Sequence, residues 1–461
     1  MPSRSKSKLS STRNPTSFYF NNPRPFGKRF VLNDRARFYV VSFLFIIVSF
    51  MKEMKTSYPR NKIKILLLEN ISDAAVAEFH ADGYAEIKRL KGALSETDLI
   101  KEIKGVHILG IRSKTHITAQ VLEHADKLLA VGCFCIGTNQ VDLRAATRKG
   151  IAVFNAPHAN TRSVAELVIG LCVMLIRKIS DKNIAAHRRV WLKDAKGSFE
   201  LRGKTLGIIG YGNIGSQVSV LAESLGLNVI YNDILTKLPL GNAKQVRDLG
   251  KLLAHSDIVT LHVPGDKTTY NMINGATLSE MKDGAILLNY ARGDVVDLNA
   301  LKKFIKNGKL SGAAIDVFPH EPEKNGDAFE SVLQNLPNVI LTPHIGGSTE
   351  EAQANIGLDV TAKLIKYLEL GASEGSHSVP PASLPLQDKT HRILHIHQNI
   401  PGVLSEINSR LSAKGINILG QFLKTNDEIG YVILDLNTKL SKEALEILKE
   451  VKGTIKTRMV Y

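Results

Sequence analysis

The sequence predicts an α/β protein with two doubly wound parallel sheets and a C-terminal ferredoxin-like βαββαβ unit. Three observations lead to this prediction. From residue 62 onward, short apolar runs alternate with amphipathic stretches of helical length, a pattern typical of parallel sheets covered by helices. One apolar run leads directly into a glycine-rich turn at 210–215. Beyond residue 389 the expected order changes to strand, helix, strand, strand, helix, strand.

Composition and charge exclude several classes of protein. The chain has 461 residues, 44% hydrophobic and 23% charged, which indicates a soluble protein of several domains rather than a disordered one. The net charge is +16, but residues 1–50 alone hold nine Lys/Arg and one acid, so we expect no nucleic-acid partner. Cys133, Cys135 and Cys172 give no disulfide framework and favour a reducing cytoplasm. We expect Cys133 and Cys135 to be buried, and we expect no metal site because no paired Cys or His motif completes one.

Residues 1–57 form a basic and then apolar leader. The apolar run from Phe38 to Met51 resembles a signal sequence or an anchor. It is shorter than the roughly 20 residues that span a membrane, and no small-residue cleavage site follows it. We favour a translation start at Met51 or Met54, and we expect neither a packed fold in the leader nor a membrane partner.

The first expected sheet begins directly after the leader. Ile63–Leu68 has the composition of a buried strand, and Ser72–Ala81 that of the helix after it. The strand pattern recurs at His107–Arg112 and Leu128–Val131. The long apolar stretch 161–179 predicts a buried helix that crosses between domains.

The second sheet is expected to contain six strands, at Leu206–Gly210, Asn228–Asn232, Ile258–His262, Ala285–Asn289, Ala313–Asp316 and Val339–Thr342. Glu350–Leu370 then predicts a helix that returns the chain to the first domain. Residues 371–388 contain three prolines and have the composition of a loose linker. The βαββαβ elements are expected at 392–397, 402–414, 417–425, 430–436, 442–451 and 454–461.

Gly210, Gly212 and Gly215 lie between a predicted strand and a predicted helix, as in a dinucleotide-binding turn. Gly210 permits the tight turn, Gly212 lets backbone amides approach a pyrophosphate, and Gly215 permits close packing of the helix on the strand. The N-terminus of the helix adds unpaired donors for the phosphates. Asp233 ends the next strand, where its carboxylate can accept the ribose hydroxyls and repel a 2′-phosphate. We therefore predict NAD as the cofactor.

Three charged side chains follow strands of the same predicted sheet: Arg292, Glu321 and His344. Each alone has a plain structural explanation, such as a surface ion pair, but together they lie at the edge where doubly wound sheets bind ligands. Oxidation of an alcohol beside a carboxylate needs a base, a cation and a hydride acceptor. We predict His344 as the base, Glu321 as the carboxylate that fixes its tautomer, and Arg292 as the clamp for the substrate carboxylate.

Four segments resemble the signatures of the D-isomer-specific 2-hydroxyacid dehydrogenases, namely 207–215, 291–297, 313–322 and 341–349. Residues 58–461 are most similar to the short, serine-inhibited bacterial members that oxidise 3-phospho-D-glycerate with NAD in the first step of serine synthesis. The resemblance implies Rossmann-like domains, a homo-oligomer, expected to be a tetramer, and cofactor contacts from Gly210, Gly212, Asn213, Ile214, Gly215, Asp233, Tyr290, Ala291, Arg292, Asp316, His344, Ile345, Gly346 and Gly347. Tyr290 is bulkier than expected, so its ring should point away from the nicotinamide.

With this resemblance, four parts of the chain are expected. They are the leader at 1–57, a substrate-binding domain at 58–159 and 347–388, an NAD-binding domain at 160–346, and a regulatory domain at 389–461. A phosphorylated substrate needs further cations. Our candidates for substrate binding are Lys91, Arg112, Ser113, Asn160 and Lys193.

The βαββαβ unit resembles an ACT domain, a module that commonly pairs between subunits and binds an amino acid. The resemblance suggests His397, Asn399 and Asn417 as ligands of the effector serine. Ile400 stands where relatives often have a basic residue, and a purely structural pairing domain is the alternative.

Two other functions remain open from the sequence. One is a dehydrogenase of another acid, such as 2-hydroxyglutarate or its partner 2-oxoglutarate. The other is an NAD-binding regulator without catalysis, which the presence of Arg292, Glu321 and His344 disfavours.

Overall fold

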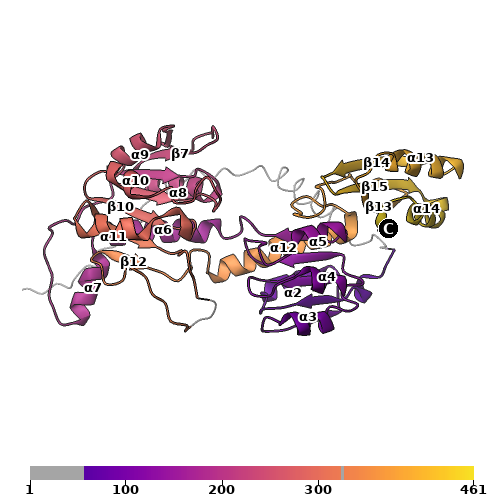
Figure 1. Cartoon of the computed structure of the whole chain (residues 1–461), viewed down its shortest axis with the longest axis horizontal. Helices are drawn as coiled ribbons and strands as arrows, with labels where there is room; N and C mark the ends of the chain where they lie inside the picture. Colours follow the sequence, from indigo (N-terminus) through magenta and orange to yellow (C-terminus); the bar gives the residue numbers. More distant parts are fainter. Residues whose placement is uncertain (1–56, 323–325) are drawn as a thin grey trace, which may run out of the picture. The chain divides into compact units, whose positions relative to one another are not determined.

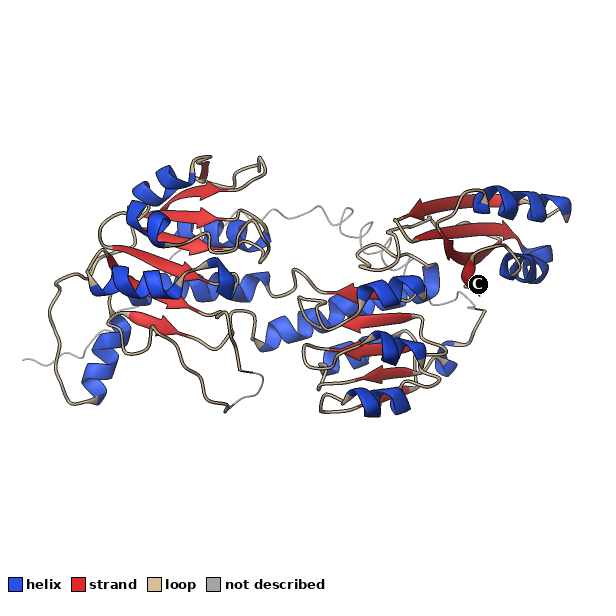
Figure 2. Cartoon of the chain, in the orientation of Figure 1, coloured by secondary structure: helices blue, strands red, loops and turns tan. Residues whose placement is uncertain are grey.

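A computed structural model describes residues 57–322 and 326–461. The chain divides into Met1–Met54 and Lys55–Tyr461, and everything described belongs to the second unit. The expectations for residues 1–56 therefore lie outside the described residues. The described part forms three sheets, five-stranded, seven-stranded and four-stranded (Figures 1 and 2), which confirms the predicted fold class. None of the helices described here is long and apolar enough to cross a membrane.

The five-stranded sheet is parallel, in the order β2-β1-β3-β4-β5. Its side chains are buried on both faces: Ile65 and Leu67 point into one apolar cluster, and Leu66 and Leu68 into another. The exposed β2 and the strand β5 were not predicted. Strands and helices are β1 (Ile65–Leu67), α2 (Asp73–Ala81), β2 (Ile87–Arg89), α3 (Glu96–Glu102), β3 (Ile108–Ile111), α4 (Ala119–Glu123), β4 (Ala130–Cys133), α5 (Leu143–Arg148) and β5 (Ala152–Asn155).

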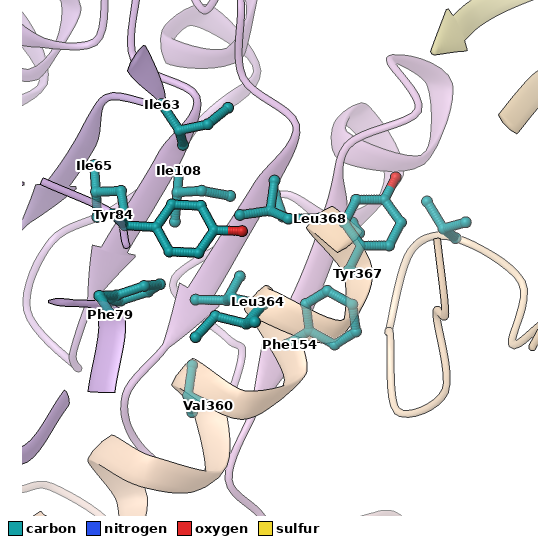
Figure 3. Close-up of a cluster of buried hydrophobic side chains, with 14 of the residues drawn as sticks. Ile63, Ile65, Phe79, Tyr84, Ile108, Phe154, Val360, Leu364, Tyr367 and Leu368 are labelled. Atoms are coloured by element: carbon teal, nitrogen blue, oxygen red, sulfur yellow. The ribbon is translucent and has the colours of Figure 1, made fainter. Parts of the chain in front are cut away.

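Helix α12 (Glu350–Leu370) covers one face of this sheet, with the bounds that the sequence predicts. It begins where the Thr349 hydroxyl accepts a bond from the Ala352 amide, and it ends at Gly371, whose φ of 68° suits glycine. Figure 3 shows side chains of α12, among them Leu364, packed against Phe154 and other residues of the sheet. The helix therefore returns the chain to the first sheet, as expected.

The seven-stranded sheet is parallel in the order β12-β11-β10-β9-β6-β7-β8. The order reverses between β6 and β9, the kind of switch point where such sheets bind ligands. The helix expected at 161–179 is interrupted, because Lys178 adopts a φ of 53°. Elements are α6 (Thr161–Ile176), α7 (Ile179–His187), β6 (Thr205–Ile209), α8 (Asn213–Ser224), β7 (Asn228–Asn232), β8 (Lys244–Gln245), α9 (Leu249–His255), β9 (Ile258–Leu261), α10 (Gly275–Glu280), β10 (Ala285–Asn289), α11 (Leu298–Lys306), β11 (Leu310–Ile315) and β12 (Val339–Leu341).

The four-stranded sheet is antiparallel in the order β14-β15-β13-β16, which is ferredoxin-like. Alternate side chains are buried on both faces: Ile393 packs with the sheet's own helices, whereas Leu394 and Ile396 join the cluster of the first sheet. Elements are β13 (Thr390–Gln398), α13 (Val403–Ala413), β14 (Ile418–Thr425), β15 (Ile429–Asn437), α14 (Ser441–Lys449) and β16 (Thr454–Met459). Short 3-10 helices lie at Arg60–Lys62, Gly293–Val295 and Thr438–Leu440.

The expected loose linker 371–388 is a packed segment in its first part. Ser373 and Ser378 are buried, and the Ser378 hydroxyl donates to the carbonyl of Ile151 beside β5. Arg392 of β13 donates to the carbonyls of Leu384 and Pro385. These bonds compensate the polar backbone of a buried loop, so proline content alone was misleading here.

Candidate active site

The glycine turn has the geometry that a dinucleotide requires. Gly210 has a φ of 92°, and a Cβ there would overlap the carbonyl of His262 at the end of β9. A Cβ on Gly215 would overlap the carbonyl of Gly210, so α8 lies against β6 only because this residue is glycine. A Cβ on Gly212 would have no protein atom within 4 Å. The space above Gly212 at the start of α8 is therefore open to a pyrophosphate.

Asp233 directly follows β7, as predicted. Its two carboxylate oxygens accept from the amides of Tyr211 (2.8 Å) and Leu235 (2.9 Å). The rings of Tyr211 and Tyr231 stack at 3.8 Å beneath this loop. Asp233 is thus held beside the glycine turn, at the edge where a ribose would lie.

Asn213 and Ile214 begin α8. The Asn213 side-chain amide lies 2.8 Å from Nδ1 of His158, a residue of the segment that precedes α6. Ile214 is half-buried and packs against the apolar cluster under the sheet. Sequence reasoning missed His158, because a single histidine after Ala156-Pro157 carries no motif.

His344 and Glu321 meet at the carboxyl edge of the seven-stranded sheet. Nδ1 of His344 and Oε2 of Glu321 are 2.7 Å apart, and Oε1 of Glu321 accepts from the Phe318 amide at 3.0 Å. Both side chains are partly exposed, at 55% and 34%. Arg292 follows β10 at the same edge, is exposed, and donates through Nη1 to the carbonyl of Ala291. Among the residues that the structure describes, the ring nitrogen Nε2 of His344 has no hydrogen-bond partner, so it can meet a ligand.

The charges of the three groups perturb one another. The hydrogen bond from Glu321 raises the pKa of His344 above its usual value; burial opposes this, the charges of Glu321 and Asp316 add to it, and Arg292 lowers it. Burial would raise the pKa of Glu321, but the bonds from His344 and Phe318 and the charges of His344 and Arg292 together lower it. Glu321 is therefore a carboxylate over the range in which His344 titrates.

Asp316 is buried and positions the loop that carries His344. Its carboxylate accepts from the Thr342 hydroxyl (2.6 Å) and from the amides of Ile345 (2.9 Å) and Gly346 (2.8 Å). His344 itself has a φ of 54°, which these bonds maintain. We predicted Asp316 as a cofactor contact from the resemblance, and the structure gives its carboxylate this internal set of bonds.

Tyr290 and Ala291 connect β10 to Arg292. Both are buried, and the Tyr290 hydroxyl lies 3.0 Å from that of Thr342. The ring therefore packs into the apolar cluster beneath the sheet edge, and its orientation relative to the nicotinamide stays a prediction. Gly347 contacts Asn160 so closely that a Cβ would overlap the Asn160 amide. The start of α6 and the segment before α12 are thus adjacent.

Three predicted substrate residues follow two strands of the five-stranded sheet. Lys91 follows β2, and Arg112 and Ser113 follow β3, with β1 between these two strands. All three lie at the carboxyl edge of the sheet. Lys193 lies elsewhere, in the exposed segment after α7, and no contact in the described part of the chain joins it to the others. Sequence reasoning also missed Glu69, a buried acid two residues after β1.

The predicted effector residues do not meet within one chain. His397 and Asn399 lie at the end of β13, where His397 pairs with Gly430 and Gly430 with Thr425. Asn417 lies before β14, at the other end of the sheet, where Ile418 pairs with Leu436. His397 is buried against Gly430, and Asn399 donates to the Asn426 carbonyl at 2.8 Å.

Two of the cysteines, Cys133 and Cys172, are buried, whereas Cys135 is only half-buried, in partial contrast to the prediction. All three are free. Within residues 57–322 and 326–461, no group of three or more His, Cys, Asp or Glu side chains is arranged to hold a metal ion.

The doubly wound sheet, the open glycine turn and the His–Glu pair together define an NAD-binding 2-hydroxyacid dehydrogenase. Residues 169–346 match the family model of the D-isomer specific 2-hydroxyacid dehydrogenase NAD binding domain. Residues 393–456 match an AHAS small subunit-like ACT domain. A crystal structure of D-lactate dehydrogenase from Aquifex aeolicus, complexed with NAD and lactic acid, is similar with a TM-score of 0.57 and 26% identity over 69% of this chain and 100% of that chain. NAD is the cofactor of this chain.

Two relatives show which 2-hydroxyacid dehydrogenases this chain is similar to. D-3-phosphoglycerate dehydrogenase of Haemophilus influenzae is 53% identical over 407 residues, which are 88% of this chain and 99% of that protein. The enzyme of the same name from Escherichia coli K12 is 51% identical over 409 residues, 88% of this chain and 100% of that protein. The chain therefore belongs to the D-3-phosphoglycerate dehydrogenase family.

Proposed function

We propose that this chain oxidises 3-phospho-D-glycerate to 3-phosphohydroxypyruvate with NAD, as the first step of serine synthesis. The observation that carries the proposal is the 2.7 Å pair of His344 and Glu321 at the sheet edge that also carries Arg292 and the open turn at Gly212. The names of the relatives support the choice of substrate. Lys91 and Arg112 supply the cations that a phosphorylated acid needs.

In this mechanism Arg292 binds the substrate carboxylate with its guanidinium. Nε2 of His344 accepts the proton of the C2 hydroxyl, and Glu321 at Nδ1 stabilises the imidazolium that forms. Bound NAD supplies the acceptor for the hydride that leaves C2. The products are the 2-oxo acid, NADH and a proton on His344, which passes to solvent because the side chain is partly exposed.

The test is the steady-state rate of NADH formation with 3-phosphoglycerate, compared with 2-hydroxyglutarate. We expect 3-phosphoglycerate to be the better substrate by kcat/KM, and a preference for 2-hydroxyglutarate would refute the choice of substrate. His344→Ala should abolish turnover and leave NADH binding intact. His255→Ala is the matched control, because His255 is an exposed histidine at the end of helix α9, where its Nδ1 lies 2.7 Å from the Lys251 carbonyl. Equal activity of the two variants would refute the role of His344.

We further propose serine as a feedback inhibitor, bound by His397 and Asn399 of one copy and Asn417 of a second copy. Strand β14 is an edge of its sheet, and its eight residues span about 25 Å. If β14 pairs antiparallel with β14 of a second copy, Asn417 of that copy comes to the end that carries Asn399. Serine would then stiffen the pairing and restrict closure of the catalytic cleft.

Inhibition by added serine, lost in Asn417→Ala, tests this site. Equal rates with and without serine would refute the effector site.

The proposed effector site also requires a homo-oligomer, expected to be a tetramer, and sedimentation of the purified chain would measure the number of copies. The free cysteines are in keeping with a cytoplasmic location.

A further inference from the structure

The five-stranded sheet contains a buried carboxylate that the proposed chemistry does not use. Glu69 is the second residue after β1 and is only 8% exposed. Its φ is 59°, and that of the next residue, Asn70, is 53°. Two consecutive residues with side chains in the left-handed region are unfavourable, so the contacts around them must hold this backbone.

The carboxylate and the backbone amide of Glu69 both make hydrogen bonds to neighbouring loops. Its carboxylate Oε1 accepts from the amides of Arg112 (3.1 Å) and Thr115 (2.9 Å), and Oε2 accepts from that of Lys114 (3.0 Å). Its own amide donates to the carbonyl of Gly92 at 3.2 Å. Glu69 therefore connects the loops that follow β1, β2 and β3, three adjacent strands of the sheet.

A second side chain holds Arg112 from the other side. Nε2 of Gln140 donates to the Arg112 carbonyl at 2.5 Å, and the Gln140 carbonyl accepts from the Ile117 amide at 2.7 Å. The amide of Arg112 is thus held by Glu69 and its carbonyl by Gln140. The bonds to the Glu69 carboxylate are charge-assisted and so stronger than neutral ones, and together with the neutral Gln140 bond they fix the backbone geometry at Arg112.

We propose that Glu69 is a positioning residue for the anionic end of the substrate, an inference that rests on the proposed function. It holds Lys91, beside Gly92, and Arg112 at a fixed separation on one sheet edge. Because its carboxylate occupies the amides of Arg112, Lys114 and Thr115, the substrate anion is bound by the cationic side chains rather than by these amides.

The experiment compares Glu69→Ala and Glu69→Gln with the wild type. We expect KM for 3-phosphoglycerate to rise about tenfold or more in Glu69→Ala, and by less in Glu69→Gln, which keeps one acceptor oxygen. The value of kcat and the Kd for NADH, measured by fluorescence quenching, should change by less than about twofold because the dinucleotide turn belongs to the other sheet. Asp126→Ala is the matched control, since Asp126 also accepts from a backbone amide, that of Gly105, but at the amino edge of the same sheet.

Three outcomes would overturn the proposal: an unchanged KM in a folded Glu69 variant, a parallel loss of NADH binding, or the same rise of KM in Asp126→Ala. If Glu69→Ala does not fold, Glu69→Gln alone decides. If the wild type prefers 2-hydroxyglutarate, the proposed substrate fails, and the KM comparison is made with that acid. Failure of the proposed function and failure of the Glu69 inference are thus distinguished.

Discussion

The glycine turn allows a prediction that separates binding from stability. A methyl group on Gly212 meets no protein atom within 4 Å, and the extended backbone of this residue is open to alanine. Alanine is a somewhat poorer N-cap than glycine, but it also reduces the entropy of the unfolded chain. The free energy of unfolding of Gly212→Ala should therefore change by less than about 1 kcal/mol.

The same methyl group would occupy the space that a pyrophosphate needs. Overpacking by one methyl group costs about 1–3 kcal/mol, so the Kd for NADH should rise about 5- to 150-fold. Gly215→Ala, in contrast, should lower the stability of the folded chain. Its Cβ would overlap the carbonyl of Gly210, so α8 must move and stability falls by about 1–3 kcal/mol.

The assays are NADH fluorescence titration and thermal unfolding without cofactor. Gly275→Ala is the matched control, because Gly275 likewise lies at the N-terminal end of a helix, as the first residue of α10, and an added Cβ there meets nothing within 4 Å. It should change neither NADH binding nor stability by more than about 1 kcal/mol. Tight NADH binding by Gly212→Ala would refute the argument that the open space above this residue receives the pyrophosphate.

Two further predictions concern charge. Oxidation needs neutral His344, so kcat/KM rises with pH through the raised pKa of this histidine. Glu321→Gln removes the negative charge and leaves only a neutral acceptor at Nδ1, so the pKa of His344 should fall and the acid limb of kcat/KM should move to lower pH. A pH profile with an unmoved acid limb would contradict this. Arg144 and Arg148 of α5 each pair with Glu428 at 2.9 Å, in the hairpin beside Asn399, so Glu428→Gln should weaken serine inhibition by about two- to thirtyfold. The serine concentration for half inhibition measures this, and equal values in both proteins would exclude the link.

The sequence predicted best the elements that have local signals. Helix α12 was predicted with its observed bounds because Thr349 caps its start and Gly371 ends it. The break at Lys178 was missed, since a lysine in the left-handed region has no sequence signature. The two-residue β8 is too short to produce a periodic pattern.

In the site, too, residues with a local sequence signal were predicted and residues without one were missed. His344, Glu321 and Arg292 were placed together because parallel strands end at one edge of a sheet, and the structure brings His344 and Glu321 into contact. The role of Glu69 was not predictable, because its bonds go to the backbone of residues more than 40 positions away. Asn417 was grouped with His397 from the resemblance, and only the strand register shows that one chain keeps them apart.

The register of β14 also has a consequence for how the proposed serine inhibition depends on enzyme concentration in a cell. If each copy carries two unlike halves of the effector site, an isolated copy has no whole site, and dissociated enzyme would escape feedback. Sensitivity to serine would then depend on mass action, rising with enzyme abundance and falling on dilution.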